Sequence, residues 1–148
     1  NLVITQTLSK AYGLAGIRLG ICYASTEVIS VLNKIKPPYN VNELSQKRAL
    51  ERLADTDKIS TEIASIIRQR EDLLEVLLHV EFVKKIYPTE ANFILVKVDD
   101  ANKRYAELIA KGIVIRNRTM QPLCDNCLRL TVGTELENRK LMAVLKQL

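Results

Sequence analysis

The last part of the chain sets the tightest limit on the fold, because strand-like and helix-like patterns alternate along it from residue 82 onward. Alternating or β-branched apolar residues predict strands at 82–89, 92–99, 113–118 and 127–132. Helical spacing of apolar residues predicts helices at 101–111 and 136–148. This order favours an α/β fold, with helices packed on a small, mainly antiparallel sheet.

Local signals predict where several helices end. Gly112 closes the helix at 101–111, and Thr134 with Glu137 forms a capping box for the last helix. Upstream, the patterns predict helices at 26–36, 40–57 and 58–80, the second with an asparagine cap. The first of these stops at "KPPYN", where two prolines bar continuation, so we expect a linker or domain boundary there.

The composition excludes several classes of protein. With 47% apolar and 26% charged residues over 148 positions, the chain is typical of soluble globular proteins that bury a core. No apolar run approaches the roughly 18 residues that span a bilayer, so we expect no membrane partner. The net charge of +5 is thinly spread and aromatics are only 5%, which favours a solvated basic surface over nucleic-acid binding. Binding of small anionic substrates is the next explanation of the positive charge.

The cysteines and the single histidine do not predict a metal site. Cys22, Cys124 and Cys127 are too few for a disulfide framework, which favours a reducing cytoplasm. Cys124 and Cys127 form a C-x-x-C, but it precedes a strand, unlike a thioredoxin-type motif. His79 is far away in sequence at the end of a helix, where a surface role is favoured over a ligand or catalytic role.

The segment "TLSKAYGLAGIRLG" (7–20) is the strongest chemical signal. It follows an apolar run, 1–8, that predicts a buried strand, and it leads into a second predicted strand, 16–25. Lys10 could form a Schiff base with an aldehyde, with the hydroxyl of Ser9 beside it. Gly13 and Gly16 allow a tight turn close to a ligand, and the fork of Arg18 suits a phosphate. One phosphorylated aldehyde, pyridoxal phosphate, would explain all these groups; the alternative is a surface lysine and a structural arginine.

Two further arginines lie on predicted strands joined by a loop. In "CLRLTV" Arg129 alternates with apolar residues, so one face of the strand is polar. If the strand at 113–118 pairs with it, Arg116 and Arg129 would face the same cleft and could bind a phosphate or carboxylate. Separate surface arginines or salt bridges remain the alternative from the residues alone.

The segment around Lys10 resembles the cofactor-lysine motif of fold-type-I, pyridoxal-phosphate-dependent aminotransferases of class I/II, in the form S-K-A-[FY]-x-L-A-G-x-R-x-G. The resemblance continues in "PPYNVN" (37–42), "ANFILVKV" (91–98) and "GIVIRNR…CLRLTVGTELEN" (112–138), and is strongest to the histidinol-phosphate branch. It implies that Lys10 binds pyridoxal 5'-phosphate covalently and that Ser9 and Arg18 hold the cofactor phosphate.

The same resemblance implies roles for the residues of the substrate site. Arg129 matches the arginine that grips the acidic group of the substrate, and Arg116 matches a second arginine of the phosphate-binding branch. Tyr39 and Asn92 match positions near the cleft entrance. The implied reaction is transamination of L-histidinol phosphate with 2-oxoglutarate in histidine biosynthesis. A threonine-phosphate decarboxylase, an aromatic aminotransferase of the same fold, or a non-catalytic anion-binding fragment are the alternatives.

The family motifs that should precede the lysine are not in this sequence. An aspartate of a D-E-A-Y-type motif and an N-P-N-x-P-T-G-type segment would lie upstream of Asn1, so we expect a C-terminal fragment that is inactive alone. Residues 1–30 would be the tail of the large cofactor domain, and 31–148 the small C-terminal domain. The resemblance also implies a homodimer for the longer protein.

Overall fold

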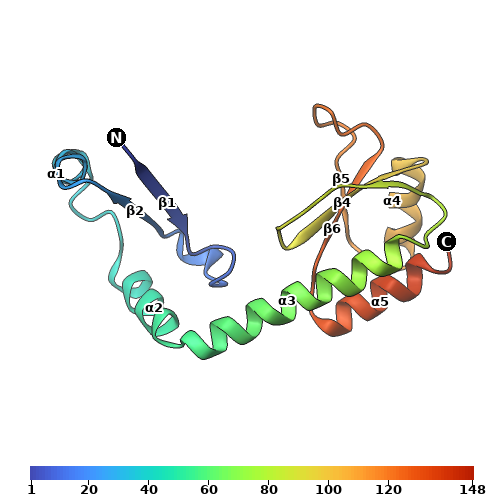
Figure 1. Ribbon diagram of the computed structural model, residues 1–148, viewed down its shortest axis with the longest axis horizontal. Helices are drawn as coiled ribbons and strands as arrows, with labels where there is room; N and C mark the ends of the chain where they lie inside the picture. Colours follow the sequence, from blue (N-terminus) through green and yellow to red (C-terminus); the bar gives the residue numbers. More distant parts are fainter. The chain divides into compact units, whose positions relative to one another are not determined.

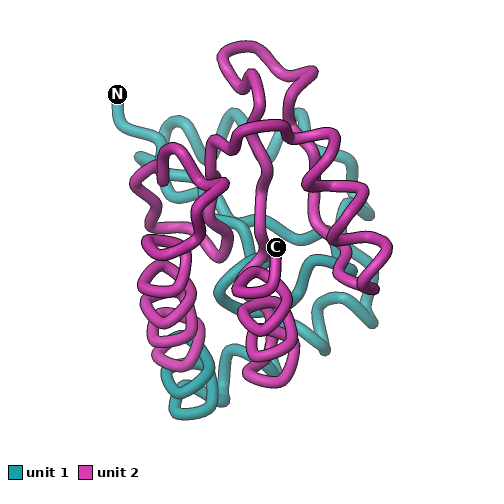
Figure 2. The backbone as a smooth tube through the Cα atoms, turned by 90° about the vertical axis from the view of Figure 1, so that its right-hand side faces the viewer, with its two compact units in different colours: residues 1–63 teal, residues 64–148 magenta.

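The computed structural model describes residues 1–148. It divides into two compact units, residues 1–63 and 64–148, coloured teal and magenta in Figure 2. Helix α3 (Thr56–Leu77) begins in the first unit and ends in the second. Each unit has its own cluster of buried apolar residues. The boundary at about residue 30 between a large-domain tail and a small domain stays a prediction.

The first unit begins with a two-stranded antiparallel ribbon, formed by β1 (Val3–Thr7) and β2 (Gly20–Ala24). The connection between the strands contains a short 3-10 helix, η1 (Ala15–Ile17). Helices α1 (Thr26–Ile35) and α2 (Glu43–Ala54) follow (Figure 1), as predicted within a few residues.

Two predictions for the opening segment are wrong in detail. The strand predicted at 1–8 exists as β1, but all five of its residues are exposed rather than buried. A ribbon of only two strands has no second layer to cover its faces, so β-branched residues are not buried here. The strand predicted at 16–25 begins only at Gly20, because η1 and the left-handed backbone of Arg18 (φ 54°) occupy its first residues.

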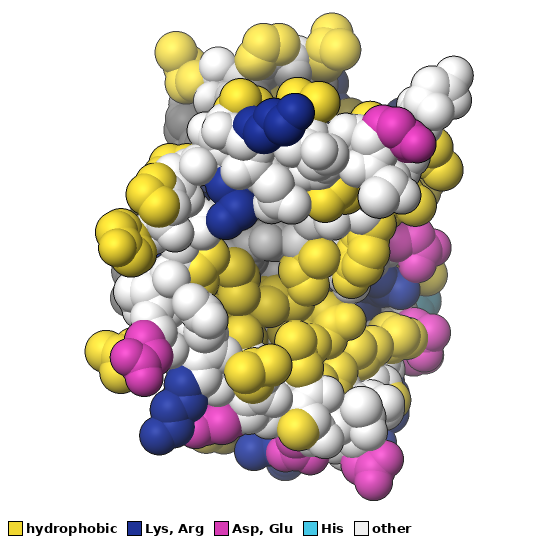
Figure 3. Space-filling model, turned by 90° about the vertical axis from the view of Figure 1, so that its left-hand side faces the viewer, with side chains coloured by type: hydrophobic (Ala, Val, Ile, Leu, Met, Phe, Trp, Pro, Cys, Tyr) yellow, Lys and Arg dark blue, Asp and Glu magenta, His cyan; other side chains and the backbone are white.

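A small apolar cluster holds the first unit together. Its buried members, Leu8, Leu14 and Ala49, pack both ends of the loop after β1 against α2. Elsewhere this unit leaves large apolar side chains at the surface, and α1 has no buried residue. Figure 3 shows hydrophobic side chains among the surface atoms, and Ile4 and Ile35 are exposed members of this unit.

The second unit is built on a four-stranded antiparallel sheet in the order β3-β4-β6-β5 (Figure 1), which confirms the predicted fold class. Its strands are β3 (Val83–Ile86), β4 (Phe93–Val98), β5 (Arg116–Asn117) and β6 (Cys127–Thr131). The strand predicted at 113–118 is therefore too long. The Ile113 N–H donates to the end of the preceding helix instead of a neighbouring strand.

The sheet buries one face and leaves the other partly exposed. In β4, Ile94, Val96 and Val98 are buried, and Leu128 and Leu130 of β6 are buried beside them. These residues pack against the end of α3 and against α4 (Ala101–Ala110) and α5 (Glu135–Leu145). The alternate residues form the opposite face, called here the arginine face; its members are Phe93, Leu95, Lys97, Arg116, Cys127, Arg129 and Thr131.

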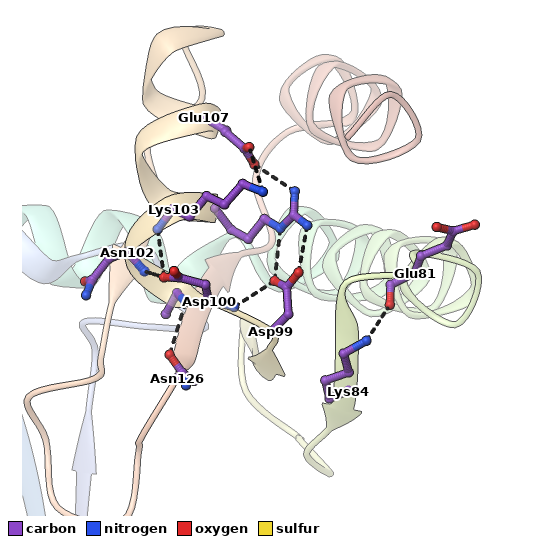
Figure 4. Close-up of polar contacts among 10 residues, drawn as sticks. Glu81, Lys84, Asp99, Asp100, Asn102, Lys103, Glu107 and Asn126 are labelled. Carbon is purple, nitrogen blue, oxygen red and sulfur yellow. Dashed lines mark hydrogen bonds and ion pairs between the residues drawn. The ribbon is translucent and has the colours of Figure 1, made fainter.

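The start of α4 is fixed by a cluster of polar contacts (Figure 4). The carboxylate of Asp100 caps the helix by accepting two backbone N–H groups of the first turn, each at 3.0 Å. Arg104 donates to both carboxylate oxygens of Asp99, at 3.0 and 2.7 Å, and to Glu107 at 2.9 Å. The hydrogen bonds from Arg104 hold the pKa of Asp99 well below its usual range.

Two predicted helix-end signals are confirmed, whereas the helices predicted at 58–80 and 136–148 end three residues earlier, at Leu77 and Leu145. Gly112 has a φ of 76°, a left-handed conformation that glycine adopts easily after a helix. Thr134 and Glu137 form the capping box of α5, with the Thr134 N–H donating to the Glu137 carboxylate at 2.7 Å. None of the helices combines the length and the apolar character that crossing a membrane would require.

Candidate functional site

Lys10 lies in a closed turn between β1 and η1, called here the lysine turn (residues 8–14). The Gly13 N–H donates to the Lys10 carbonyl at 2.8 Å, and the Leu14 N–H donates to the Leu8 carbonyl at 2.9 Å. Gly13 has a φ of 68°, which glycine adopts without strain. Leu8 and Leu14 are buried at the two ends, whereas Lys10 is exposed. The fold therefore presents Lys10 on an anchored turn.

Ser9 and Arg18 lie at the same end of the ribbon as Lys10. The Leu8 N–H donates to the Leu19 carbonyl at 3.3 Å, so the neighbours of Ser9 and Arg18 are joined directly. The Arg18 guanidinium donates to the Ala15 carbonyl at 3.1 Å. The backbone of Arg18 is left-handed, which is unusual for a residue other than glycine and costs about 1–2 kcal/mol. Such strain persists where the surrounding structure requires it, often at functional sites.

These groups fit a phosphorylated aldehyde. Lys10 supplies an amine, Ser9 a hydroxyl and Arg18 a guanidinium, which are suitable partners for an aldehyde and a phosphate. A Cβ placed on Gly16 would meet no atom within 4 Å, so the backbone there stands beside open space. The sequence prediction assigned this glycine a close approach to a ligand, and the open space is compatible with that role.

Arg116 and Arg129 are direct partners in the sheet. The antiparallel register of β5 and β6 pairs them with each other, which is the pairing considered for these segments from the sequence. Residues directly opposite in an antiparallel pair point to the same side, with Cβ atoms about 4.5–5.5 Å apart. Two like charges at such positions repel each other, and an anion placed between them would relieve the repulsion.

The surroundings of Arg129 hold its guanidinium on the arginine face. The guanidinium carbon lies 5.0 Å from the centre of the Phe93 ring, in a cation–π contact. Its Nε is buried and has no hydrogen-bond partner within the chain. A buried donor without a partner lowers the stability of the fold. Arg116, opposite, is exposed.

The two remaining predicted site residues, Tyr39 and Asn92, are exposed. Tyr39 belongs to the first unit and is 95% exposed in the turn that follows the two prolines. Asn92 belongs to the second unit, at the start of β4, where its carbonyl accepts the Val132 N–H at 2.9 Å. Its side chain is exposed. The assignment of both residues to a substrate cleft stays a prediction.

The cysteines form no disulfide, and no group of three or more His, Cys, Asp or Glu residues has metal-site geometry. Cys127 is buried, and Cys22 and Cys124 are half-buried. Burial raises the pKa of the Tyr87 hydroxyl, and the neighbouring Cys127 raises it further. The C-x-x-C segment thus belongs to the turn before β6, where the Cys127 N–H donates to the Cys124 carbonyl at 3.0 Å.

Sequence reasoning missed two groups of residues at these sites. Phe93 stacks on Arg129, and the period-2 pattern of β4 could have placed it on the same face as the arginine. Arg52 and Glu62 contact each other, and Arg52 also contacts the backbone of the lysine turn. No local signal reveals this contact, because it joins residues 40 positions apart.

Comparison with known proteins identifies relatives over the whole chain. The family Aminotransferase class I and II matches residues 1–145. A histidinol-phosphate aminotransferase of Flavobacterium johnsoniae is 78% identical over all 148 residues. The structure of a histidinol-phosphate aminotransferase from Clostridium acetobutylicum is similar over 99% of the chain, with a TM-score of 0.87 and 27% identity. An L-threonine-O-3-phosphate decarboxylase from Porphyromonas gingivalis has a TM-score of 0.82 over 99% of the chain, at 22% identity, and shows the fold alone.

The chain spans less than half of each of these proteins: 42% of the Flavobacterium johnsoniae relative, 45% of the Clostridium acetobutylicum chain and 46% of the Porphyromonas gingivalis chain. The family match, however, covers nearly all of this chain, from the strand before Lys10 to the last helix. The chain therefore belongs to the class I and II aminotransferase family.

Proposed function

We propose that this chain is part of an enzyme that transfers the amino group of L-histidinol phosphate to 2-oxoglutarate, with pyridoxal 5'-phosphate as cofactor. The 78% identity to a relative of that name supports the substrate, and family membership supports the cofactor. The observation that carries the proposal is the register of β5 and β6, which sets Arg116 directly opposite Arg129. Histidinol phosphate has no carboxylate, and a phosphate gives a reason for two guanidiniums rather than one.

The lysine turn would hold the cofactor. The bound cofactor supplies an aldehyde that accepts an amine and a ring system that stabilises negative charge at the neighbouring carbon. Lys10 would bind the aldehyde through its Nζ, and Ser9 and Arg18 would bind the phosphate. The Lys10 Nζ would also take the proton from the substrate α-carbon as a general base. The hydrogen-bonded turn would keep the Lys10 backbone in place for both roles.

The arginine face would bind the acidic group of each substrate. For histidinol phosphate, the guanidiniums of Arg116 and Arg129 would share the phosphate oxygens. For 2-oxoglutarate, the same pair would bind the distal carboxylate. Stacking on Phe93 limits the rotation of the Arg129 guanidinium, so the second half of the reaction meets a preformed site.

A sister activity on the same fold is the first alternative. A threonine-phosphate decarboxylase would also use a phosphate-binding arginine pair, and an aromatic aminotransferase would share the cofactor site. The test uses the longer protein, of the length of its relatives, loaded with cofactor. Glutamate formed from 2-oxoglutarate only in the presence of histidinol phosphate would support the proposal. Release of carbon dioxide from threonine phosphate, without glutamate formation, would refute it.

A protein that binds anions without covalent chemistry is the second alternative. It would bind phosphate at Arg116 and Arg129 but would not need Lys10. Under this alternative, Lys10→Ala leaves phosphate binding unchanged. Pyridoxal phosphate can also be added to this chain, reduced with borohydride, and the labelled lysine mapped by mass spectrometry. Selective labelling of Lys10 supports the proposal, whereas labelling spread over many lysines means that the cofactor site needs the rest of the longer protein. The homodimer expected from the resemblance stays a prediction.

A further inference from the structure

A third arginine, Arg52 of α2, binds the lysine turn from the side. Its Nε–H donates to the Tyr12 carbonyl at 2.9 Å. Tyr12 lies inside the turn, between Lys10 and Gly13, which are joined by the hydrogen bond that closes it. The Arg52 side chain is only 10% exposed, so water competes little for this contact. A charged donor therefore holds the backbone two residues from Lys10.

Glu62 orients the Arg52 guanidinium from the opposite side. Its two carboxylate oxygens accept from Nη1 and Nη2 of Arg52, so that the fork is bound on one edge while Nε binds the turn. The hydrogen bond from Arg52 lowers the pKa of Glu62, and desolvation opposes this effect. With both edges of the planar guanidinium bound, its rotation is restricted, which a lysine at this position could not reproduce.

Arg52 is one of three contacts that a single face of α2 makes with the segment around Lys10. Ser45, Ala49 and Arg52 follow one another at helical spacing of four and three residues, so they lie on the same side of the helix. Ser45 donates to the Ile17 carbonyl at 3.4 Å. Ala49 packs with Leu8 and Leu14. α2 thus fixes the segment at its two apolar anchors, at η1 and at the turn itself.

We propose that Arg52, oriented by Glu62, is a positioning residue that keeps the lysine turn in the conformation in which Lys10 engages the cofactor. The chemical role of Lys10 in this statement rests on the proposed function; the hold of Arg52 on the turn does not. Arg52 touches neither cofactor nor substrate in this assignment and acts through the Tyr12 carbonyl. The competing explanation is that the Arg52–Glu62 pair only stabilises the corner between α2 and α3.

Hydrogen exchange of backbone amides separates the two explanations on the chain without cofactor. The Gly13 and Leu14 amides report closure of the turn, and amides of the β4–β6 ladder report the fold of the second unit. In Arg52→Met, loss of a charge-assisted bond should speed exchange at Gly13 and Leu14 by about tenfold or more, relative to amides in α2. Glu62→Gln should speed it less, because the Nε–H bond remains.

The matched control is Arg48→Met. Arg48 is on the same helix, is 61% exposed and pairs with Glu51 at 3.6 Å. It should leave exchange at Gly13 and Leu14 unchanged. Unchanged exchange at these two amides in Arg52→Met would overturn the proposal, as would an increase no larger than that of the α2 amides. If Arg52→Met unfolds the first unit, Glu62→Gln decides, since it leaves Arg52 in place.

Kinetics of the longer, cofactor-loaded protein test the link to Lys10. Arg52→Met should lower kcat about tenfold or more while the KM for histidinol phosphate stays within about twofold, because the arginine pair is untouched. Arg52→Lys should not restore kcat, because a lysine cannot bind the Tyr12 carbonyl and the Glu62 carboxylate in the same way at once. An equal effect on kcat and KM would overturn the positioning role. If wild-type Lys10 cannot be labelled by the cofactor, the proposed function fails, and the exchange result still stands for the turn.

Discussion

Inorganic phosphate should stabilise this chain, and Arg116→Met should remove most of that stabilisation. Arg116 and Arg129 are opposed in register, so their mutual repulsion lowers the stability of the sheet until an anion binds between them. Arg116 is exposed and is the better member of the pair to replace. Replacing Arg129 would also remove its contact with Phe93 and so would mix two effects.

The magnitude follows from the two-point contact. Two hydrogen bonds to charged groups contribute a net of about 1.5–3 kcal/mol each, or about 3–6 kcal/mol together. A binding free energy of about 4 kcal/mol, within this range, corresponds to a Kd of about 1 mM. At about 10 mM phosphate, mass action then adds about 1.4 kcal/mol to the free energy of unfolding. For a unit of this size, that corresponds to a rise in Tm of roughly 6–11 °C. With one arginine left and a Kd about tenfold weaker, the gain falls to about 0.4 kcal/mol.

The assay is thermal unfolding followed by circular dichroism, in phosphate and in chloride at equal ionic strength. Arg139→Met is the matched control, because Arg139 is an exposed arginine of the same unit that pairs with Glu135 at 2.7 Å. General salt effects of phosphate act on all three proteins and cancel in the comparison. If Arg116→Met gains as much from phosphate as the wild type and Arg139→Met do, the arginine pair is not an anion site and the reasoning fails.

Three further predictions concern stability. Asp99→Asn should lower the free energy of unfolding by about 1 kcal/mol at pH 7, a small effect because the pair with Arg104 is partly exposed. The lowered pKa of Asp99 in the folded protein stabilises the fold at pH values above the unfolded pKa of about 3.9. The difference in free energy of unfolding between wild type and Asp99→Asn should therefore shrink as the pH falls from 5 to 3. A difference that stays constant with pH in urea unfolding would contradict this. Leu128→Ala, at a 1% exposed position, should cost about 2–5 kcal/mol, and a loss under about 1 kcal/mol in the same assay would argue against its place in the core. Gly112→Ala should lower the free energy of unfolding by about 1 kcal/mol or more, because alanine does not easily adopt a φ of 76°. Gly16→Ala should be nearly neutral, because the added Cβ meets no atom within 4 Å. Equal losses of stability in the two variants would contradict this.

The second unit could be predicted closely because its signals are local. The period-2 pattern of β4 and β6 predicts both the strands and their buried faces, and the capping box at Thr134 predicts the start of α5. Each of these signals involves residues within one turn or one strand. The strand predicted at 113–118 is too long because its start depends on a contact outside the strand. Whether Ile113 pairs with a strand or caps α4 depends on the helix that precedes it.

The first unit shows what composition alone cannot decide. The β-branched residues of β1 predict a strand correctly but not its burial, since burial requires a second layer that a two-stranded ribbon does not have. The turn at Gly13 was predicted from the glycine spacing. The left-handed backbone of Arg18 was not, because residues other than glycine rarely adopt it.

The order of strands and helices, two of the helix caps and the chemical groups near Lys10 can be read from local sequence. Nearby residues encode these features, through side-chain periodicity and backbone preference. The position of Arg116 opposite Arg129 depends on how the strands pack, because a loop between two strands does not specify their register. The tertiary structure also decided that Arg52 holds the Tyr12 carbonyl across 40 positions of sequence. Contacts of this kind depend on how distant segments pack, and no local pattern contains that information.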